Sequence, residues 1–102
     1  MKAASELYED GLKEDLQDPE EAAAYLNAAI EDGSQAVFLL ALRDVAEARG
    51  VATVAHQAAL NRENAYRILS EKGNPQLASL MALLDVLGLR LAIEAKHPAA
   101  AA

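Results

Sequence analysis

Apolar residues recur at the spacing of one helix face in two runs, and a helix-start signal precedes each run. The first signal is Asp18-Pro19, where aspartate can cap a helix, proline suits its first position and Glu21 can complete a capping box. Asn74-Pro75 repeats the signal. The runs are Ala22, Tyr25, Leu26, Ala29 and Ile30, closed by Gly33, and Leu77, Leu80, Met81, Leu84 and Leu87, closed by Gly88. They predict a helix that starts at Pro19 and another over Gln76–Leu87.

A third helix is predicted between these two, over Gln35–Arg49, with Ser34 as its cap and Gly50 as its end. It is the most apolar of the predicted helices, with Phe38, Leu39, Leu42, Val45 and Ala46. We expect it to be the central helix of the core, with Phe38 serving in packing rather than in ligand binding.

Composition agrees with a single small helical domain. The chain has 102 residues, of which 53% are hydrophobic but only 4% aromatic, with one Phe and no Trp. A chain of this length can build one modest core. That core must consist of Leu, Val, Ile and Ala, and an alanine-rich composition favours helix.

The stretch from Thr53 to Ser70 reads as two short helices joined by a tight turn, the second beginning at Asn61. The residues expected to face inward are Val54, Ala55, Ala58, Leu60, Ala65 and Ile68, and those expected to point outward are Arg62, Glu63, Asn64, Tyr66 and Arg67. A helix-turn-helix presents a polar second helix of this kind to the major groove of DNA. The pattern therefore predicts a DNA-binding module, although purely structural bundles also contain such pairs.

Each outward residue of this stretch has a predicted role. Arg62 and Arg67 can bond guanine or grip phosphate, and Asn64 can read adenine. Glu63 is expected to pair with Arg67 at the i, i+4 spacing rather than to accept from cytosine. Tyr66 suits a phosphate, a thymine methyl group or the core. The cap Asn61 is expected to orient the helix near a base or phosphate. Thr53 and Gln57 are expected to lie over the DNA backbone, with Gln57 favoured as the phosphate contact. Ser70 and Lys72 flank the far end of the second helix.

The net charge of −7 is unevenly distributed along the chain. Residues 1–48 hold 3 basic and 12 acidic side chains, whereas residues 49–102 hold 6 basic and 4 acidic ones. The net charges of the two halves, −9 and +2, recover the total of −7. Phosphate contacts need cations, so the second half suits DNA. The acidic half indicates a second partner of opposite charge, or a surface that serves solubility alone.

The pattern changes to alternation over residues 89–96, with Leu89, Leu91, Ile93 and Ala95 on one side. This predicts a strand, yet no other segment offers it a partner, and an unpaired strand leaves its backbone groups unsatisfied. We expect the same strand of a second chain to pair with it, antiparallel, in a homodimer. Continuation as helix is the alternative. Residues 1–17 are predicted to be a flexible arm and residues 97–102 a disordered tail.

Little in the sequence suggests an enzyme. There is no Cys, only His56 and His97 as imidazoles, no metal-ligand spacing and no glycine-rich phosphate loop. We expect no catalytic residue, cofactor, metal or small-molecule substrate. No window has the roughly 18 apolar residues of a membrane span, and no signal core is present at the N-terminus. A cytoplasmic protein is therefore expected, since a lack of cysteine fits a reducing compartment.

The chain resembles the addiction-module antidote family, the HigA-like antitoxins with a Cro/repressor-type helix-turn-helix. The resemblance extends from about Tyr8 to Glu94 and is carried by DPEEAAAYLNAAIEDG (Asp18–Gly33), FLLALRDVAEARG (Phe38–Gly50), NRENAYRILSEKGNP (Asn61–Pro75) and LGLRLAI (Leu87–Ile93). In the family the recognition helix usually reads S-R-E-S-L-Y-R-A-L-S, which matches Asn61 to Ser70, and a GNP turn matches Gly73, Asn74 and Pro75. Two departures are Ala59, where the turn normally has glycine, and Asn61 in place of a cap serine.

The resemblance implies two activities. Such antidotes neutralise a small, usually basic ribonuclease toxin of the RelE/HigB kind, and they repress their own operon as dimers on a palindromic double-stranded operator. We therefore expect an all-α, five-helix domain over residues 18–96 with a dimerising strand. The alternatives are a repressor without a toxin and a helical adaptor that does not bind DNA.

Overall fold

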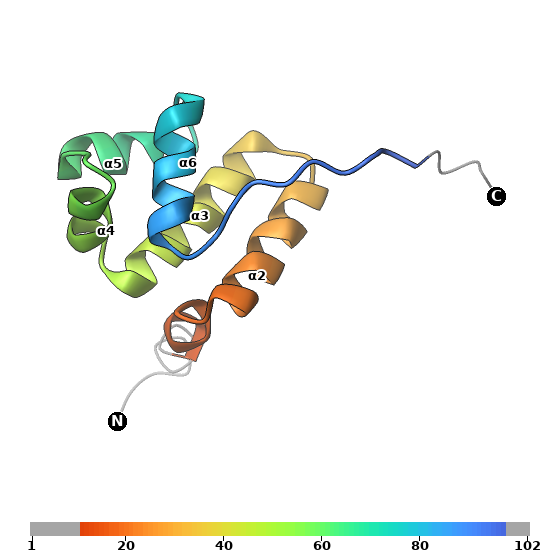
Figure 1. Cartoon of the computed structure of the whole chain (residues 1–102), viewed down its shortest axis with the longest axis horizontal. Helices are drawn as coiled ribbons and strands as arrows, with labels where there is room; N and C mark the ends of the chain where they lie inside the picture. Colours follow the sequence, from red (N-terminus) through yellow and green to blue (C-terminus); the bar gives the residue numbers. More distant parts are fainter. Residues whose placement is uncertain (1–10, 98–102) are drawn as a thin grey trace.

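The computed structural model describes residues 11–97, and within this range it is helical without any strand (Figure 1). The predicted all-α class is confirmed. The helices with assigned bounds are α2 (Pro19–Glu31), α3 (Gln35–Arg49), α4 (Val51–Gln57), α5 (Arg62–Ile68) and α6 (Leu77–Val86). Residues 11–16 are also helical.

Polar caps begin three of these helices where the sequence predicts them. An oxygen of the Asp18, Ser34 and Asn61 side chains accepts a backbone N–H in the first turn of α2, α3 and α5, at 3.0, 3.3 and 2.7 Å. The capping box at Asp18 is not formed, because the carboxylate accepts from the amide of Glu20 instead of Glu21. The start signal Asn74-Pro75 does not supply the first residues of α6, because this helix has Gln76 as its N-cap and begins at Leu77.

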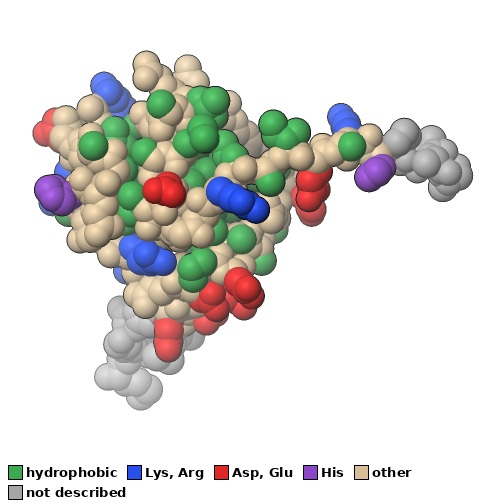
Figure 2. Space-filling model, in the orientation of Figure 1, with side chains coloured by type: hydrophobic (Ala, Val, Ile, Leu, Met, Phe, Trp, Pro, Cys, Tyr) green, Lys and Arg blue, Asp and Glu red, His purple; other side chains and the backbone are tan. Residues whose placement is uncertain are grey.

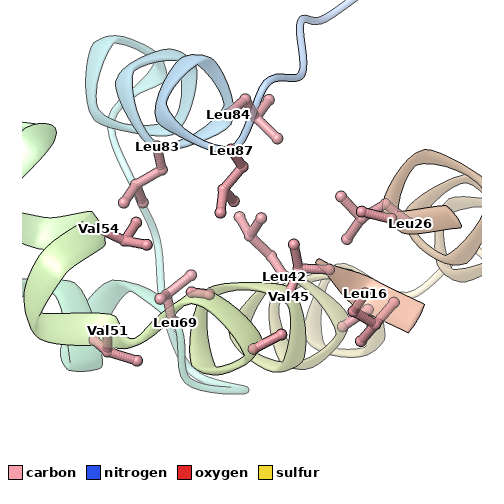
Figure 3. Packing of buried hydrophobic residues seen from close by; sticks show 14 of the residues in the cluster. Leu16, Leu26, Leu42, Val45, Val51, Val54, Leu69, Leu83, Leu84 and Leu87 are labelled. Atoms are coloured by element: carbon pink, nitrogen blue, oxygen red, sulfur yellow. The ribbon is translucent and has the colours of Figure 1, made fainter. Parts of the chain in front are cut away.

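The helix α3 lies in the middle of the core, as predicted, and contributes more buried side chains than any other described helix. Figure 3 shows Leu83 of α6 and its C-cap Leu87 directed toward Leu42 of α3 and Val54 of α4. On the other side α2 packs along α3, and the hydroxyl of Tyr25 donates to Asp44 at 2.6 Å. The core thus consists of aliphatic side chains and alanines, which let the short helices approach closely. Its members are Leu16, Ala22, Leu26, Ala29, Leu39, Ala41, Leu42, Val45, Ala46, Ala48, Val51, Val54, Ala55, Ala65, Leu69, Leu83, Leu84 and Leu87.

Residues 11–17, which the sequence analysis places in a flexible arm, are attached to the domain. Leu16 is buried in the core. The Gln17 side-chain amide donates to the carbonyl of Ala48 at 2.9 Å, and Arg49 donates to the carbonyl of Gln17 at 3.3 Å. The prediction of a flexible arm is therefore wrong for residues 11–17, because a buried leucine and two long-range hydrogen bonds hold them against the helices. Residues 1–10 lie outside the described residues.

Residues 89–97 follow α6 as an extended segment that is neither helix nor strand. The last backbone hydrogen bond before it runs from the Leu89 amide to the carbonyl of Leu84, at 2.8 Å. From there the segment crosses the helices and then projects away from them (Figure 1). The helical alternative is wrong, because Gly88 has a φ of +79° and turns the chain out of the α6 axis. Within residues 11–97 no other segment of the chain is a strand that could pair with it. Residues 98–102 of the predicted tail lie outside the described residues.

Candidate nucleic-acid interface

The helices α4 and α5 form the pair of short helices that the sequence predicts between Thr53 and Ser70. After α4 the chain turns at Ala59, whose φ is +60°. The amide of Leu60 donates to the carbonyl of Ala55 at 2.8 Å, and the amide of Ala59 donates to the carbonyl of His56 at 3.1 Å. These two bonds define a Schellman ending, in which a residue with positive φ closes a helix. The tight turn predicted here is confirmed, with alanine in the position that glycine normally takes.

This conformation gives a first testable prediction, that Ala59→Gly stabilises the protein. An L-residue in the left-handed region costs about 1–2 kcal/mol, whereas glycine adopts it freely but loses about 0.5–1 kcal/mol of chain entropy on folding. We expect a net gain of roughly 0.5–1 kcal/mol in the free energy of unfolding, measured by urea denaturation. The matched change Ala24→Gly, on the exposed surface of α2, should instead lose about 1 kcal/mol. Equal losses in both variants would contradict the role of Ala59.

The helix α5 has one buried side and one exposed side. Ala65 and the following Leu69 are fully buried, whereas Arg62, Glu63 and Arg67 are exposed. Of the residues predicted to face inward, Val54, Ala55 and Ala65 are buried, and Ala58, Leu60 and Ile68 are partly buried against the core. The predicted division between the two sides of this helix pair is therefore confirmed, except that Asn64 and Tyr66 are half-buried.

A hydrogen-bonded chain runs along the outer side of α5. The side-chain oxygen of Asn61 accepts the amide of Asn64 at 2.7 Å. The side-chain oxygen of Asn64 in turn accepts from Nη2 of Arg67 at 2.6 Å. The predicted pair between Glu63 and Arg67 is wrong: among the described residues Arg67 donates to Asn64, one turn before it. The prediction was that Asn64 and Arg67 each contact DNA independently. In the structure, Asn64 instead holds Arg67 by this hydrogen bond.

The ring of Tyr66 lies close to two guanidinium groups, those of Arg43 at 5.5 Å and Arg62 at 5.6 Å from its centroid. At this range the aromatic face attracts a cation. Arg43 also donates through Nε to Glu47 at 2.9 Å, and this hydrogen bond raises the pKa of the Arg43 guanidinium. The half-buried ring also packs against the core, which is one of the roles considered for Tyr66.

Arg43 belongs to this surface although the sequence analysis did not include it. It lies on α3, 23 positions before Tyr66, inside the helix predicted to be the centre of the core. No local signal marks it, because only the tertiary fold brings its guanidinium to the ring. The candidate interface therefore consists of α5 with one arginine from the core helix.

The other predicted contacts lie around this helix. Thr53 and Gln57 are exposed on α4, and Lys72 is exposed after α5. Ser70 is half-buried, and its hydroxyl donates to the carbonyl of Arg67 at 2.9 Å. Basic and acidic side chains are mixed over α4 and α5, whereas acidic ones gather at the lower edge, near the start of α2 (Figure 2).

Among residues 11–97 no cluster of His, Asp or Glu could hold a metal ion. None of the helices described there is long and apolar enough to cross a membrane.

These features define a small all-helical protein in which the short helix α5 packs against α4 and exposes a polar side. A family model described as "Probable addiction module antidote protein" matches residues 6–95, so the chain belongs to this family. An uncharacterized protein of Haemophilus influenzae is 33% identical over 89 residues, which cover 87% of this chain and 92% of that protein. No solved structure matches.

The family assignment confirms the resemblance to the antidotes found in the sequence. An antidote is the antitoxin of a toxin–antitoxin module, so the family implies a toxin as partner. The family's role is neutralisation rather than catalysis, in agreement with the prediction that the chain is not an enzyme.

Proposed function

We propose that this antitoxin represses its own operon by binding DNA through α5, the recognition helix of a helix-turn-helix formed with α4. The observation that supports this most is the exposed side of α5, where Arg62 and Arg67 point outward on a helix whose other side packs against the core through Ala65 and Ile68. A helix fixed in this way can enter the major groove without losing its own packing.

The two arginines are held in place by different neighbouring side chains. Arg62 lies at the first position of α5 beside the ring of Tyr66, and Arg67 is held by the side-chain oxygen of Asn64. A guanidinium that is already oriented loses less entropy when it makes a bidentate contact with guanine. Both arginines are assigned to base edges, and Asn64 positions Arg67.

The remaining contacts are assigned to the DNA backbone, which fixes register but carries no sequence information. Gln57 and Thr53 of α4 lie exposed before the turn, and Lys72 lies exposed after α5. Asn61 and Ser70 serve the helix itself, one as its cap and the other by its bond to the Arg67 carbonyl. Because few cations are available, we expect the affinity for DNA to fall with salt, but with a shallow slope.

The repressor acts as a homodimer in this proposal. Pairing of residues 89–96 between two chains would satisfy the backbone groups of the extended segment. It would also relate two copies of α5 by a two-fold axis. Copies roughly 34 Å apart would read the two halves of a palindromic operator.

The toxin, in this proposal, is a small basic ribonuclease of the RelE/HigB kind that binds the acidic half of the chain in the cytoplasm. Residues 1–48 carry a net charge of −9. Within the described part, Glu14, Asp15, Asp18, Glu20 and Glu21 are all exposed around the start of α2. Complementary charge speeds the encounter with a cationic partner and selects against acidic ones.

The DNA contacts predict that Arg62→Ala and Arg67→Ala each weaken binding to the operon's own promoter by about 1–3 kcal/mol, roughly fivefold to 150-fold. Gel-shift titration at fixed salt measures this, and sedimentation should show an unchanged dimer. Lys13→Ala removes a cation from the exposed surface of residues 11–16 and should leave the affinity nearly unchanged. Wild-type binding by either arginine variant would remove that residue from the interface.

The same titration separates the alternatives. Binding that ignores sequence, or that persists unchanged at high salt, would favour a helical adaptor over a repressor. Co-purification with the product of the neighbouring reading frame tests the toxin, and operator binding without any such partner would indicate a stand-alone repressor.

A further inference from the structure

An apolar groove of about 550 Å³ lies between α2, the start of α3, the end of α6 and residues 89–94. Its apolar lining comes from Leu26, Ile30, Phe38, Leu84, Leu89 and Leu91. Three charged side chains, Glu31, Arg90 and Glu94, also line it. One wall of the groove is therefore the extended segment itself.

The segment has the properties of half of a two-stranded ribbon. Beyond Leu89 none of its described residues takes part in a backbone hydrogen bond. Leu91 is 44% exposed and Ile93 is fully exposed, at 100%. A solvent-facing isoleucine beside an unpaired backbone leaves both apolar area and polar groups unsatisfied, and pairing with another strand would bury both.

The side chains of the segment match those of its own antiparallel copy in one register. We propose that two chains pair over residues 90–94 with the two-fold axis at Ala92, so that each chain's Ile93 occupies the other's groove. In this register Arg90 lies opposite Glu94 twice, and Leu91 lies opposite Ile93 twice. Residues directly opposite share a face of the ribbon, so the two ion pairs lie on one face and the two apolar pairs on the other.

Neighbouring registers lose this complementarity. With the axis at Ile93, Arg90 faces Lys96 and like charges oppose each other. With the axis at Leu91, Glu94 faces Gly88, which has no side chain. An axis between two residues sets a charged side chain against an apolar one, as in Arg90 against Ile93. The smallest side chain of the segment's centre, Ala92, lies on the axis, where the two copies approach most closely.

The same register explains how the groove is filled. Side chains directly opposite in an antiparallel pair have Cβ atoms about 4.5–5.5 Å apart. Leu91 lines the groove, so the Ile93 opposite it comes from the second chain and enters the same space. Each groove is thus incomplete in a single chain. The inference adds a register and a side-chain partner to the homodimer of the proposed function, and it depends on neither DNA nor toxin.

Because the chain has no cysteine, single substitutions can map the register by disulfide formation. A residue on the two-fold axis faces its own copy with the Cα atoms about 4.5–5.5 Å apart, which suits a disulfide. Under mild oxidation Ala92→Cys should give the covalent dimer efficiently, whereas Leu91→Cys and Ile93→Cys should each give it poorly alone but efficiently when mixed. Preferred self-linking at 91 or 93, or no linking at any of the three, would overturn the register.

Charge exchange tests the ion pairs in the unmodified backbone. Arg90→Glu sets an acidic residue 90 opposite the Glu94 of the other chain in both pairs. Glu94→Arg sets a basic residue 94 opposite the Arg90 of the other chain in both pairs. Each single variant should dimerise at least about tenfold more weakly at low salt. An equimolar mixture of the two, or the double variant R90E/E94R, should recover the wild-type association measured by sedimentation. Unchanged single variants, or no recovery on mixing, would overturn the proposal.

The groove is tested by a matched pair of exposed apolar residues. Ile30 lines the groove and is 53% exposed, whereas Met81 lies on α6 outside it and is 51% exposed. Ile30→Asp should weaken the dimer by at least about tenfold, because burying an unpaired carboxylate is costly, and Met81→Asp should not. Circular dichroism confirms that both variants fold. The reverse result would place the interface on α6 and overturn the proposal.

These measurements report only association between two copies. If they fail while operator and toxin binding persist, the ribbon and the pairing of residues 89–96 are wrong, and the proposed binding of operator and toxin stands. If the ribbon forms and neither operator nor toxin is bound, the proposed function is wrong instead.

Discussion

Gly73→Ala is expected to destabilise the protein by about 3 kcal/mol or more, because a Cβ atom at this position would occupy the space of the backbone. An ideal Cβ on Gly73 lies 2.0 Å from the carbonyl oxygen of Ile68 and 3.0 Å from that of Ser70. Backbone carbonyls cannot rotate aside as a side chain can, so the turn between α5 and α6 must open.

The turn at Gly73 also connects distant parts of the fold. Its amide donates to the carbonyl of Ser70 at 2.9 Å, and its carbonyl accepts from the Gln35 side chain at 3.1 Å. Opening the turn would therefore disturb the end of α5 and the beginning of α3 together. We expect a lower urea midpoint and weaker DNA binding in the same variant.

Gly11→Ala is the control for this prediction. Gly11 is helical, and nothing lies within 4 Å of its ideal Cβ. Alanine there should change the free energy of unfolding by about +0.5 to +1 kcal/mol in favour of the folded state. A Gly73→Ala protein as stable as the wild type would show that the turn can open at no cost.

Leu69→Ala should cost about 2–5 kcal/mol, the second largest effect we predict. Leu69 is 0% exposed, and it is the residue that closes α5 and inserts into the core (Figure 3). Truncation removes apolar contacts and leaves a cavity under the end of the recognition helix of the proposed function. Thermal or urea unfolding measures the loss of stability, and DNA affinity should fall at temperatures where the variant is still folded.

Leu77→Ala makes the same chemical change at a site that is 63% exposed. Its effect should stay within about 0.5 kcal/mol, since surface substitutions rarely exceed this value. Equal losses in the two leucine variants would contradict the packing described for the end of α5.

The local structure was largely determined by the sequence. Asp18, Ser34 and Asn61 are capping residues at positions where their short side chains reach a free amide, so the starts of α2, α3 and α5 could be predicted. The spacing of apolar residues likewise predicted which sides of α4 and α5 are buried. The alternation over residues 89–96 predicted a strand, and the structure has there an extended segment that is neither helix nor strand.

Contacts between distant segments could not be predicted in this way. The arginine of α3 that joins Tyr66 and the leucine that anchors residues 11–17 are each separated from their partners by many positions. Within α5, Arg67 could reach either Glu63 or Asn64, and the surrounding geometry decided for Asn64.

Capping and periodicity are properties of neighbouring residues, so the sequence by itself determined the starts of α2, α3 and α5 and the exposed side of α5. Long side chains choose among several partners at similar cost, and that choice depends on which helices lie side by side. Only the tertiary structure therefore decided that Arg43 belongs to the candidate interface, that residues 11–17 are attached, and that residues 89–94 form one wall of an open groove.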